Sequence, residues 1–290
     1  MLQKIPERMK GKAIGFFGAG RVGGALLFHC LRSGYRISGI YDVNQRRLRN
    51  IARKLKVRTA RKPEEVVLES DVLFFTVPDR EITRVYQQVK SKIRPGTVLV
   101  HCAGAFGSEL FAGAEELGLE TLALHPVQTF VSDEQAVRSL PGSYFALDGS
   151  AAGLRFGRSL VRALRGRGVV IKGEYRPLYH ALCVFSSNFL NALFYAAEQI
   201  GRKIDLAPAD TRRILKPLAR VTLENILNYG ACASLTGPVR RADERTIRIH
   251  LRMLKRHLPE AVPVYRTLTS WLRQMLRAEE EKRRGEKKEG

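Results

Sequence analysis

Three glycines near the start of the chain are spaced so that their backbone could cradle a phosphate group. Gly18, Gly20 and Gly23 follow the apolar run Ala13–Phe17 and precede a helix-like segment. In such a strand, turn and helix, the first glycine permits the tight turn and the second lets the backbone approach a pyrophosphate. The third allows the helix to pack closely on the strand. The free N–H groups at the start of the helix would then face the phosphates, which predicts a dinucleotide site.

An acidic residue at the expected distance supports this interpretation. Asp42 ends the second apolar run, 19 residues beyond Gly23, where a carboxylate would accept hydrogen bonds from the adenosine ribose. Such an acid favours the free ribose hydroxyl of NAD, whereas Arg46 and Arg47, just beyond it, could clamp the 2′-phosphate of NADP. We therefore expect either cofactor, with NAD slightly preferred.

Further polar segments follow the predicted strands. Ligands bind outside the carboxyl ends of the strands in open α/β sheets, and this rule selects residues 18–23, 76–79, 101–106 and 125–130. Backbone and small side chains of the second and third segments would flank the nicotinamide and its ribose. The predicted cofactor-binding residues are Gly18, Ala19, Gly20, Arg21, Val22, Gly23, Asp42, Val77, Pro78, Ala103 and Gly104.

The segment 125–130, HPVQTF, places an imidazole, an amide and a hydroxyl directly after a strand. His125 could donate a proton to a carbonyl as hydride arrives, because its ordinary pKa lies near the working pH. Alternatively, it pins the loop through backbone hydrogen bonds. Gln128 and Thr129 are candidate substrate contacts, and His101, at the end of another strand, is a weaker candidate that could equally be structural.

The apolar helix predicted over residues 177–201 carries polar side chains that need partners. Asn188 and Asn191 are three residues apart and therefore share a face, and His180 falls near it. A substrate cleft between two domains would supply partners, and hydrogen bonds between helices are the alternative. We predict His180 and Asn188 as catalytic candidates, and Ser187 and Asn191 as substrate contacts.

A turn over residues 236–243, TGPVRRAD, leads into a later helix, for which Asp243 is a plausible N-cap. Arg240 or Arg241 could bind an anionic substrate, and Arg241 is the candidate that we favour. The alternative is a turn within the domain whose arginines are solvated.

The order of apolar runs defines the fold class. Strands and helices alternate up to about residue 173, which predicts a doubly wound, mostly parallel α/β sheet of the Rossmann type. Residues 174–290 contain no strand-like alternation and should form an all-α domain for substrate binding and dimerisation. The predicted domains are thus 1–173 and 174–290, with a frayed tail over 279–290. The predicted helices of the second domain span residues 177–201, 208–230, 243–257 and 262–277.

Composition narrows the functional classes. The net charge is +22, but the basic residues are scattered along helices, so we do not expect specific nucleic-acid binding. The four cysteines form no Cys-x-x-Cys pair or other metal-ligand pattern. No signal peptide or apolar run long enough for a bilayer is evident, which predicts a cytoplasmic protein without a membrane partner. A helix as apolar as residues 181–197 must be surrounded, and we expect it to form a buried part of a homodimer core.

Six ordered motifs carry a resemblance to a known family. The segments are GAGRVGGAL, FFTVPD, VHCAGAFGSELF, LHPVQTF, YHALCVFSSNFLNAL and LTGPVRRADERTIRIHL. Together they resemble the Rossmann-like oxidoreductases whose helical C-terminal half is a domain of unknown function. The resemblance covers about residues 12–276. It is looser toward the wider superfamily of 6-phosphogluconate dehydrogenase, 3-hydroxyisobutyrate dehydrogenase, ketopantoate reductase and pyrroline-5-carboxylate reductase.

This resemblance implies an NAD(P)-binding domain, a helical dimerisation domain and a substrate site between them. One position departs from the pattern. The hydroxyacid dehydrogenases of the superfamily carry a lysine four residues before an asparagine that matches Asn188, and it serves as their acid or base. Here that position is Val184, so the proton donor would be His125, His180 or water, and water would suit an imine substrate that arrives protonated.

The sequence therefore predicts an NAD(P)-dependent oxidoreductase that transfers hydride between nicotinamide and a small carbonyl, alcohol or imine. The missing lysine keeps a second hypothesis open, a cofactor-binding sensor or regulatory protein without catalysis.

Overall fold

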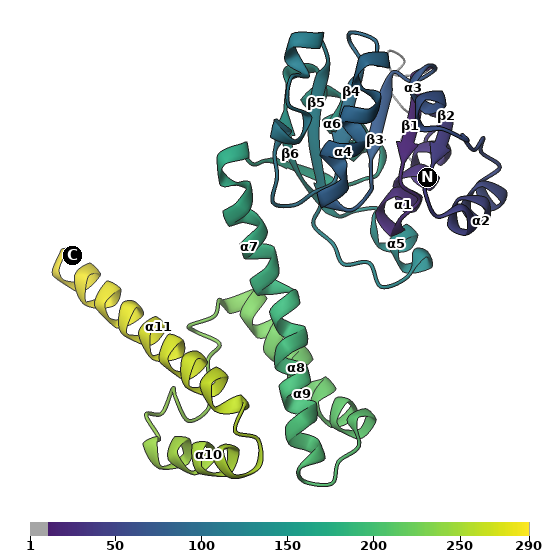
Figure 1. The fold of residues 1–290 in the computed structure, drawn as a ribbon. Coiled ribbons are helices and arrows are strands. Elements are labelled where there is room, and N and C mark those ends of the chain that lie inside the picture. Colours follow the sequence, from purple (N-terminus) through teal and green to yellow (C-terminus); the bar gives the residue numbers. More distant parts are fainter. Residues whose placement is uncertain (1–10, 290) are drawn as a thin grey trace. The chain divides into compact units, whose positions relative to one another are not determined.

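The computed structural model of the chain describes residues 11–289. Contacts between residues divide the chain into two compact units, Met1–Ser187 and Asn188–Gly290. Figure 1 shows the mixed sheet of the first unit and the helices of the second. Each unit is described by itself below.

The first unit is built on one seven-stranded sheet with the order β2-β1-β3-β4-β5-β6-β7. All neighbouring strands are parallel except the antiparallel pair β5 and β6. The mostly parallel, doubly wound sheet predicted from the sequence is thus confirmed. The strands are β1 (Ala13–Phe17), β2 (Arg36–Tyr41), β3 (Val72–Phe75), β4 (Val98–His101), β5 (Glu120–Pro126), β6 (Tyr144–Gly149) and β7 (Arg167–Val170).

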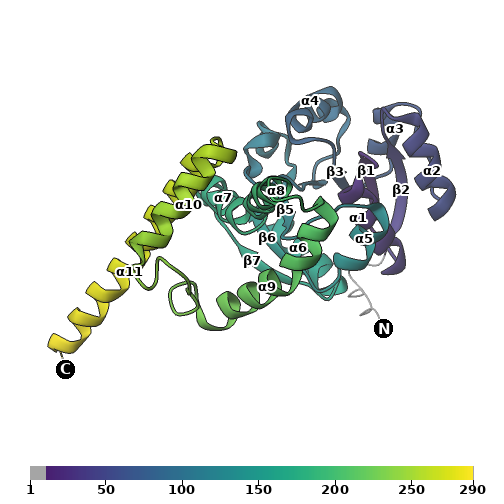
Figure 2. The same ribbon diagram turned by 90° about the horizontal axis from the view of Figure 1, so that it is seen from below.

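Helices cover both faces of this sheet, as the view from below shows (Figure 2). They are α1 (Arg21–Arg32), α2 (Gln45–Leu55), α3 (Pro63–Val67), α4 (Asp79–Val89), α5 (Asp133–Ser139) and α6 (Ala151–Ala163). α7 (Arg176–Ser186) follows the last strand and covers neither face, and its side chains are exposed at Leu178 and Leu182. Short 3₁₀ turns occupy Lys90–Lys92, Ser108–Phe111, Glu115–Leu117 and Gly173–Tyr175.

Pairs of consecutive phenylalanines tie the central strands to both layers. Phe16 stacks on Phe74 with ring centroids 4.8 Å apart, and Phe17 lies 4.9 Å from Phe75. Because successive side chains of a strand point to opposite faces, Phe16 and Phe74 belong to one core and Phe17 and Phe75 to the other. This packing fixes β1 beside β3, where the strand order reverses and a ligand is expected.

The helix predicted over residues 177–201 is interrupted, which corrects the sequence-based expectation. α7 ends at Ser186, Ser187 has non-helical dihedral angles, and α8 starts at Asn188. The Ser186 hydroxyl donates to the carbonyls of Leu182 and Cys183, a local contact that competes with the helical ladder and bends helices. The predicted domain boundary at residue 173 follows the last strand, whereas the compact units divide after Ser187. α7 falls in the first unit, where Tyr179 contacts His125 of β5 and Arg176 contacts Ala103.

The second unit contains α8 (Asn188–Arg202), α9 (Pro208–Tyr229), α10 (Glu244–His257) and α11 (Ala261–Glu289). It is all-helical, as predicted. α8 packs on α9 and α10 packs on α11. α11 continues to Glu289, so the tail from residue 279 is helical in the structure, and its fraying stays a prediction. Arg283 pairs with Glu279 and Lys282 with Glu286 at the i,i+4 spacing that supports a helix.

The apolar segment 181–197 is largely exposed within the single chain. Leu182 is 65% exposed, Leu193 41% and Tyr195 64%. The neighbouring face of α9 is equally open at Leu218, which is 65% exposed. The two helices α8 and α9 cover each other on one side only, so a homodimer through this surface stays a prediction.

Candidate functional site

The glycine turn joins β1 to α1 and has the backbone geometry expected of a phosphate-binding turn. Gly18 has φ +100°, and a Cβ there would lie 2.6 Å from the carbonyl of Thr76. A Cβ on Gly23 would lie 2.5 Å from the carbonyl oxygen of Gly18. At Gly20, by contrast, the nearest atom would be 3.6 Å away. Two of the glycines are therefore required by the fold, while the third leaves space that a ligand can enter.

Thr76, at the end of β3, holds this turn from the neighbouring strand. Its hydroxyl is 2.9 Å from the carbonyl oxygen of Gly18 and 3.1 Å from that of Phe17. These two hydrogen bonds satisfy the carbonyl oxygens of Phe17 and Gly18 on the side of the turn that faces the strand. The N–H groups at the start of α1 are left to face outward, as an anion requires.

A cavity of about 420 Å³ opens beside the turn. Its wall brings together five of the predicted cofactor-binding residues, namely Gly18, Gly20, Asp42, Val77 and Pro78. Arg47, Arg80 and Arg84 add positive charge to the same wall. We call this cavity the dinucleotide groove.

Asp42 lies in the wall of this groove and is tied to the turn. Its two carboxylate oxygens accept the backbone N–H groups of Ala19, at 2.6 Å, and Asn44, at 2.7 Å. Carboxylate oxygens retain further acceptor positions, so Asp42 can still accept from a ribose hydroxyl.

Arg21 and Val22, the remaining predicted residues of the turn, open helix α1. The Arg21 guanidinium donates to the carbonyl of Phe130, 3.2 Å away. Arg21 therefore connects the glycine turn to the loop after β5, which is a structural task. Val22 packs partly buried against the core.

A cluster of ring side chains lies at Gly104, where the nicotinamide was expected. A Cβ on Gly104 would collide with Nδ1 of His180 and lie 3.0 Å from Nε2 of His125. The two imidazole rings are 5.7 Å apart, and Nδ1 of His125 is 2.7 Å from the hydroxyl of Tyr179. Nδ1 of His180 is buried without a hydrogen-bond partner among the described residues. The structure thus brings together two predicted catalytic histidines and adds Tyr179.

Arg176 is the charged centre of this cluster. Its side chain is fully buried, and its Nη2 donates to the carbonyl of Ala103 at 3.0 Å. Its Nε and Nη1 have no hydrogen-bond partner among the described residues. Burial lowers the pKa of Arg176, and the carboxylate of Asp148 raises it. An arginine nevertheless stays protonated in a protein, so the cluster contains a buried positive charge.

This environment keeps His125 neutral. Burial lowers its pKa to about 4, and the positive charge of Arg176 and the imidazole of His180 contribute in the same direction. Burial raises the pKa of Tyr179, an effect strengthened by its interaction with Cys183. At neutral pH the pair is therefore a neutral imidazole hydrogen-bonded to a protonated phenol.

His101 has a structural role in this arrangement. Its Nδ1 accepts the N–H of Ala103, and its Nε2 is 2.8 Å from the carbonyl oxygen of Gly107. Burial lowers its pKa to about 4. A neutral imidazole satisfies both bonds and holds the loop after β4 in place, consistent with the structural alternative for this residue.

The other predicted substrate contacts are less closely associated with the cluster. Gln128 accepts the backbone N–H of Thr129, and both residues lie exposed on the loop after β5. Ser187 ends the first unit. Asn188 and Asn191 start α8, and Arg241 lies in the turn before α10. These last three residues belong to the second unit, and their participation stays a prediction.

Tyr179 and Arg176 were missed by sequence reasoning, and their signals were weak. Arg176 precedes Pro177 at the start of α7, a position where arginines are usually solvated. Tyr179 stands next to His180 within an apolar motif, and only the packing of α7 on the first unit reveals its contact with His125.

Two negative observations complete the site. No group of three His, Cys, Asp or Glu side chains is placed to hold a metal ion in the part of the chain that the structure describes. Among residues 11–289, no helix has the length and apolar character needed to span a membrane.

Two family models match consecutive parts of the chain. A Rossmann-like domain matches residues 5–126, and the model described as Domain of unknown function (DUF2520) matches residues 143–271. The chain is thus a Rossmann-like domain followed by this domain of unknown function, which confirms the resemblance seen in the motifs.

A curated relative supports the same grouping at lower coverage. The pyrroline-5-carboxylate reductase of Methanosarcina acetivorans is 26% identical over 137 residues, which are 46% of this chain and 51% of the relative. The chain therefore spans about half the length of this curated relative.

Solved structures share the fold over nearly the whole chain. BF3122 of Bacteroides fragilis, named as a candidate NADP oxidoreductase, has a TM-score of 0.77 at 23% identity and covers 91% of this chain and 98% of its own. TM1727 of Thermotoga maritima has a TM-score of 0.70 at 27% identity, with coverages of 92% and 99%. The imine reductase of Myxococcus stipitatus, solved in complex with NADP⁺, has a TM-score of 0.67 at 18% identity, with coverages of 92% and 94%.

Proposed function

We propose that this protein is an NAD(P)-dependent oxidoreductase that transfers hydride between a nicotinamide cofactor and a small carbonyl, alcohol or imine substrate. The observation that carries this proposal is the dinucleotide groove, in which Gly20 leaves space beside the N-terminus of α1 and Asp42 lies in the wall. Relatives in fold include an imine reductase solved with NADP⁺ and a variant of it solved with NAD⁺.

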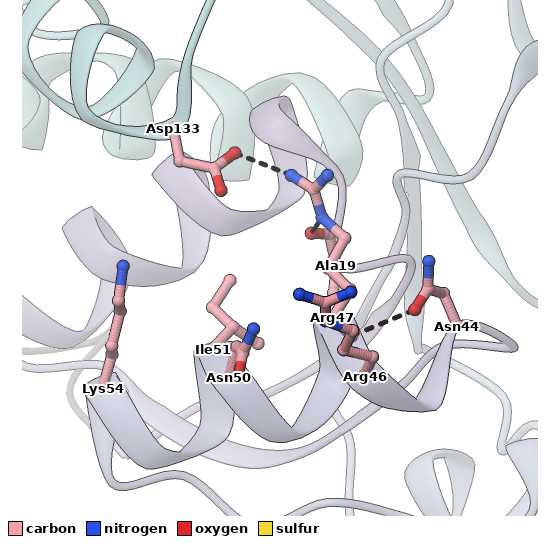
Figure 3. Close-up of a pocket in the computed structure, with 8 residues that line it drawn as sticks. All are labelled: Ala19, Asn44, Arg46, Arg47, Asn50, Ile51, Lys54 and Asp133. Atoms are coloured by element: carbon pink, nitrogen blue, oxygen red, sulfur yellow. Dashed lines mark hydrogen bonds and ion pairs between the residues drawn. The ribbon is translucent and has the colours of Figure 1, made fainter.

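The residues present fit a dinucleotide. The outward N–H groups at the start of α1 suit a pyrophosphate. Asp42 can accept a ribose hydroxyl, and its negative charge disfavours a 2′-phosphate in the same place. Arg47, one of the arginines in the groove wall, pairs with Asp133 at 2.7 Å and donates to the carbonyl of Ala19 (Figure 3). These contacts favour NAD over NADP in the groove.

In the proposed reaction, His125 and Tyr179 supply the proton that the substrate takes up. When bound, a reduced nicotinamide supplies the hydride. Nε2 of His125, on the side of Gly104, donates a proton to the substrate oxygen or nitrogen. The Tyr179 hydroxyl passes its proton to Nδ1 of His125, so the imidazole never carries a full positive charge. The guanidinium of Arg176, 6.0 Å from the Tyr179 ring, stabilises the phenolate that remains.

This relay accounts for the missing superfamily lysine. Val184 stands where that lysine would be, and His125 with Tyr179 would take its place as the source of the proton. His180, whose Nδ1 lacks a partner among the described residues, is proposed to contact the substrate. Asn188 is retained as a candidate contact from α8.

The proposal is tested by a screen of small hydroxyacids, ketoacids and cyclic imines with NADH and NADPH, followed by the absorbance of the reduced cofactor. On the substrate found, Tyr179→Phe should lower kcat by roughly 10²-fold, the usual contribution of a positioned acid, without changing cofactor affinity. Tyr175→Phe is the matched control, because Tyr175 lies one turn away and is 57% exposed. Absence of turnover with every substrate would count against the enzyme.

A cofactor-binding sensor is the alternative, and the absence of the lysine motivates it. It gains support if NADH binds, no substrate is turned over, and His125→Ala leaves the affinity for NADH unchanged.

We also propose that the chain forms a homodimer through α8 and α9. A groove of about 510 Å³ lies between these two helices and is lined almost entirely by apolar side chains, including Leu193, Phe194 and Leu218. Burying this much apolar surface would favour association. The molar mass in solution, measured over a range of concentrations, tests the proposal, and a constant monomer mass would overturn it.

A further inference from the structure

Helix α10, which packs on α11 in the second unit (Figure 1), carries a row of basic side chains along one face. The members of the row are three or four residues apart, with one adjacent pair at its end, so they share a face of the helix. All of them are exposed, namely Arg245, Arg248, Arg252, Lys255 and Arg256. We call this row the α10 stripe. Cations that look scattered along the sequence are thus aligned by the helix.

The charge of the α10 stripe is largely uncompensated by the protein. Its last four members make no ion pair with any residue that the structure describes. Arg245 interacts with the carboxylate of Asp243, the N-cap of the helix. Glu244, the single acid within α10, pairs with Arg273 of α11 at 2.5 Å instead. The stripe therefore presents positive charge to a partner outside the second unit.

The apolar face of α10 is used for packing within the second unit. Ile247 is 4% exposed, and Leu258, which follows the helix, is 5% exposed. A basic helix that binds a membrane inserts its own apolar face at the boundary of the acyl chains. Only Ile249 and Met253 are half exposed beside the stripe, too little apolar surface for such insertion. The free face of α10 thus suits a partner that is recognised by charge.

The length of the stripe matches the spacing of phosphates in a nucleic-acid duplex. At a rise of 1.5 Å per residue, the eleven steps from Arg245 to Arg256 span about 16 Å. One strand of a duplex presents a phosphate for about every 3.4 Å of its axis, or roughly five over this distance. Four of the five cations are arginines, whose planar guanidinium matches the geometry of phosphate oxygens. The number, spacing and type of the cations therefore agree with those of one phosphodiester backbone.

We propose that the α10 stripe binds the phosphodiester backbone of a nucleic-acid duplex without reading its sequence. A duplex fits better than a single strand, because single strands are held by stacking on aromatic side chains, and α10 contains no Phe, Tyr or Trp. Backbone contacts carry no sequence information. The proposed partner is therefore compatible with the expectation that the protein recognises no specific nucleic acid.

The proposal is tested by removing two charges from the stripe in a double variant, Arg248→Gln with Arg252→Gln. The control is Arg155→Gln with Arg158→Gln, which removes two exposed arginines from α6 and leaves the same net charge. A third protein, Arg248→Lys with Arg252→Lys, keeps the charge of the stripe. Glutamine and lysine have helix propensities close to that of arginine, so the thermal midpoints of all variants should match that of the parent protein.

Binding is measured by fluorescence anisotropy of a labelled duplex of about 20 base pairs over a range of KCl concentrations. Each neutralised phosphate contributes about −0.9 to the slope of log affinity against log salt concentration, so the parent protein should give a slope of about −4 to −5. The glutamine pair on α10 should reduce the magnitude of this slope by about 2 and weaken binding at least about tenfold. The control pair should change the affinity less than about twofold, and the lysine pair should retain the slope.

Three outcomes would overturn the proposal. Absence of saturable binding by the parent protein at about 0.1 M KCl would leave no site, and an equal loss in the control pair would indicate diffuse attraction to the net charge. Equal or tighter binding of the stripe to poly-glutamate or to vesicles containing phosphatidylglycerol would assign it to an acidic protein or a membrane. DNA and RNA duplexes of one sequence, titrated in parallel, identify the nucleic acid that is bound. None of these measurements requires hydride transfer, so their outcome is independent of the proposed oxidoreductase activity.

Discussion

Alanine substitutions at Gly18 and Gly20 should separate the two tasks of the glycine turn. The residues are two positions apart, and each substitution adds one methyl group. At Gly18 the new methyl would meet the backbone of Thr76 at 2.6 Å, with φ at +100°. At Gly20, φ is −62° and the nearest atom would be 3.6 Å away.

The expected effects on stability follow from this geometry. A left-handed backbone costs a residue with a Cβ roughly 1–2 kcal/mol, and an overlap that must be relieved in a packed core costs about 1–3 kcal/mol more. Gly18→Ala should therefore destabilise the protein by about 2–5 kcal/mol and lower the thermal midpoint by roughly 5–15 °C. Gly20→Ala loses only the small preference for glycine at an N-cap, about 1 kcal/mol or less.

The affinity for NADH, in contrast to stability, should be lowered directly by the substitution at Gly20. Gly20→Ala places its methyl in the space that a pyrophosphate needs, so we expect NADH to bind at least about tenfold more weakly to a protein that is still folded. Thermal unfolding and NADH fluorescence titrations measure the two effects separately. Parent-like affinity in Gly20→Ala would refute the placement of the dinucleotide at α1, and a parent-like midpoint in Gly18→Ala would refute the strain argument.

Three further predictions concern the buried cluster and the helical surface. The folded-state pKa of His101 is lowered from 6.5 to about 4. Its neutral form therefore contributes on the order of 3 kcal/mol to the free energy of unfolding. This contribution is complete above pH 6.5 and is lost as the pH falls toward 4. Urea unfolding at pH 7 and pH 4.5 should show this loss, and a His101→Gln variant should show less of it. Arg176→Met should raise the pKa of His125, because the guanidinium's positive charge helps to lower it. An unchanged imidazole titration by NMR would mean that burial alone keeps it low. Leu193→Glu should yield a monomer in light-scattering measurements, whereas Leu68→Glu, at an exposed position in the first unit, should not, and equal masses for both variants would exclude this dimer surface.

The parts of the site that sequence predicts best are those where backbone geometry dictates residue type. Gly18 and Gly23 leave no room for a Cβ, so their spacing, together with the strand before them and the helix after them, predicts the turn. Apolar runs also identify the strands, since β1, β3 and β4 are buried along their whole length. Asp42 was identified because the distance along a βαβ unit is nearly constant.

The remaining features depend on contacts between segments far apart in the chain. Tyr179 reaches His125 across 54 positions, and Arg176 reaches Ala103 across 73. No local pattern distinguishes these two from a surface tyrosine and arginine. The break at Ser187 was also missed, because Ser186 and Ser187 are compatible with a continuous helix until the hydroxyl bond to Leu182 is seen.

The buried positive charge of Arg176 limits which protonation state of His125 can donate a proton. If His125 were protonated on both nitrogens before it donated, it would be an imidazolium. The positive charge of Arg176 disfavours that form, because it lowers the pKa of His125. A neutral donor backed by a phenol avoids this cost, because the proton leaves Nε2 as another arrives at Nδ1. The negative charge then appears on Tyr179, where the guanidinium stabilises it. The charge that disfavours the imidazolium form of His125 thus also opposes the rise that burial causes in the pKa of Tyr179. If the proposed relay operates, loss of Arg176 should therefore lower turnover even though the Arg176 side chain is buried.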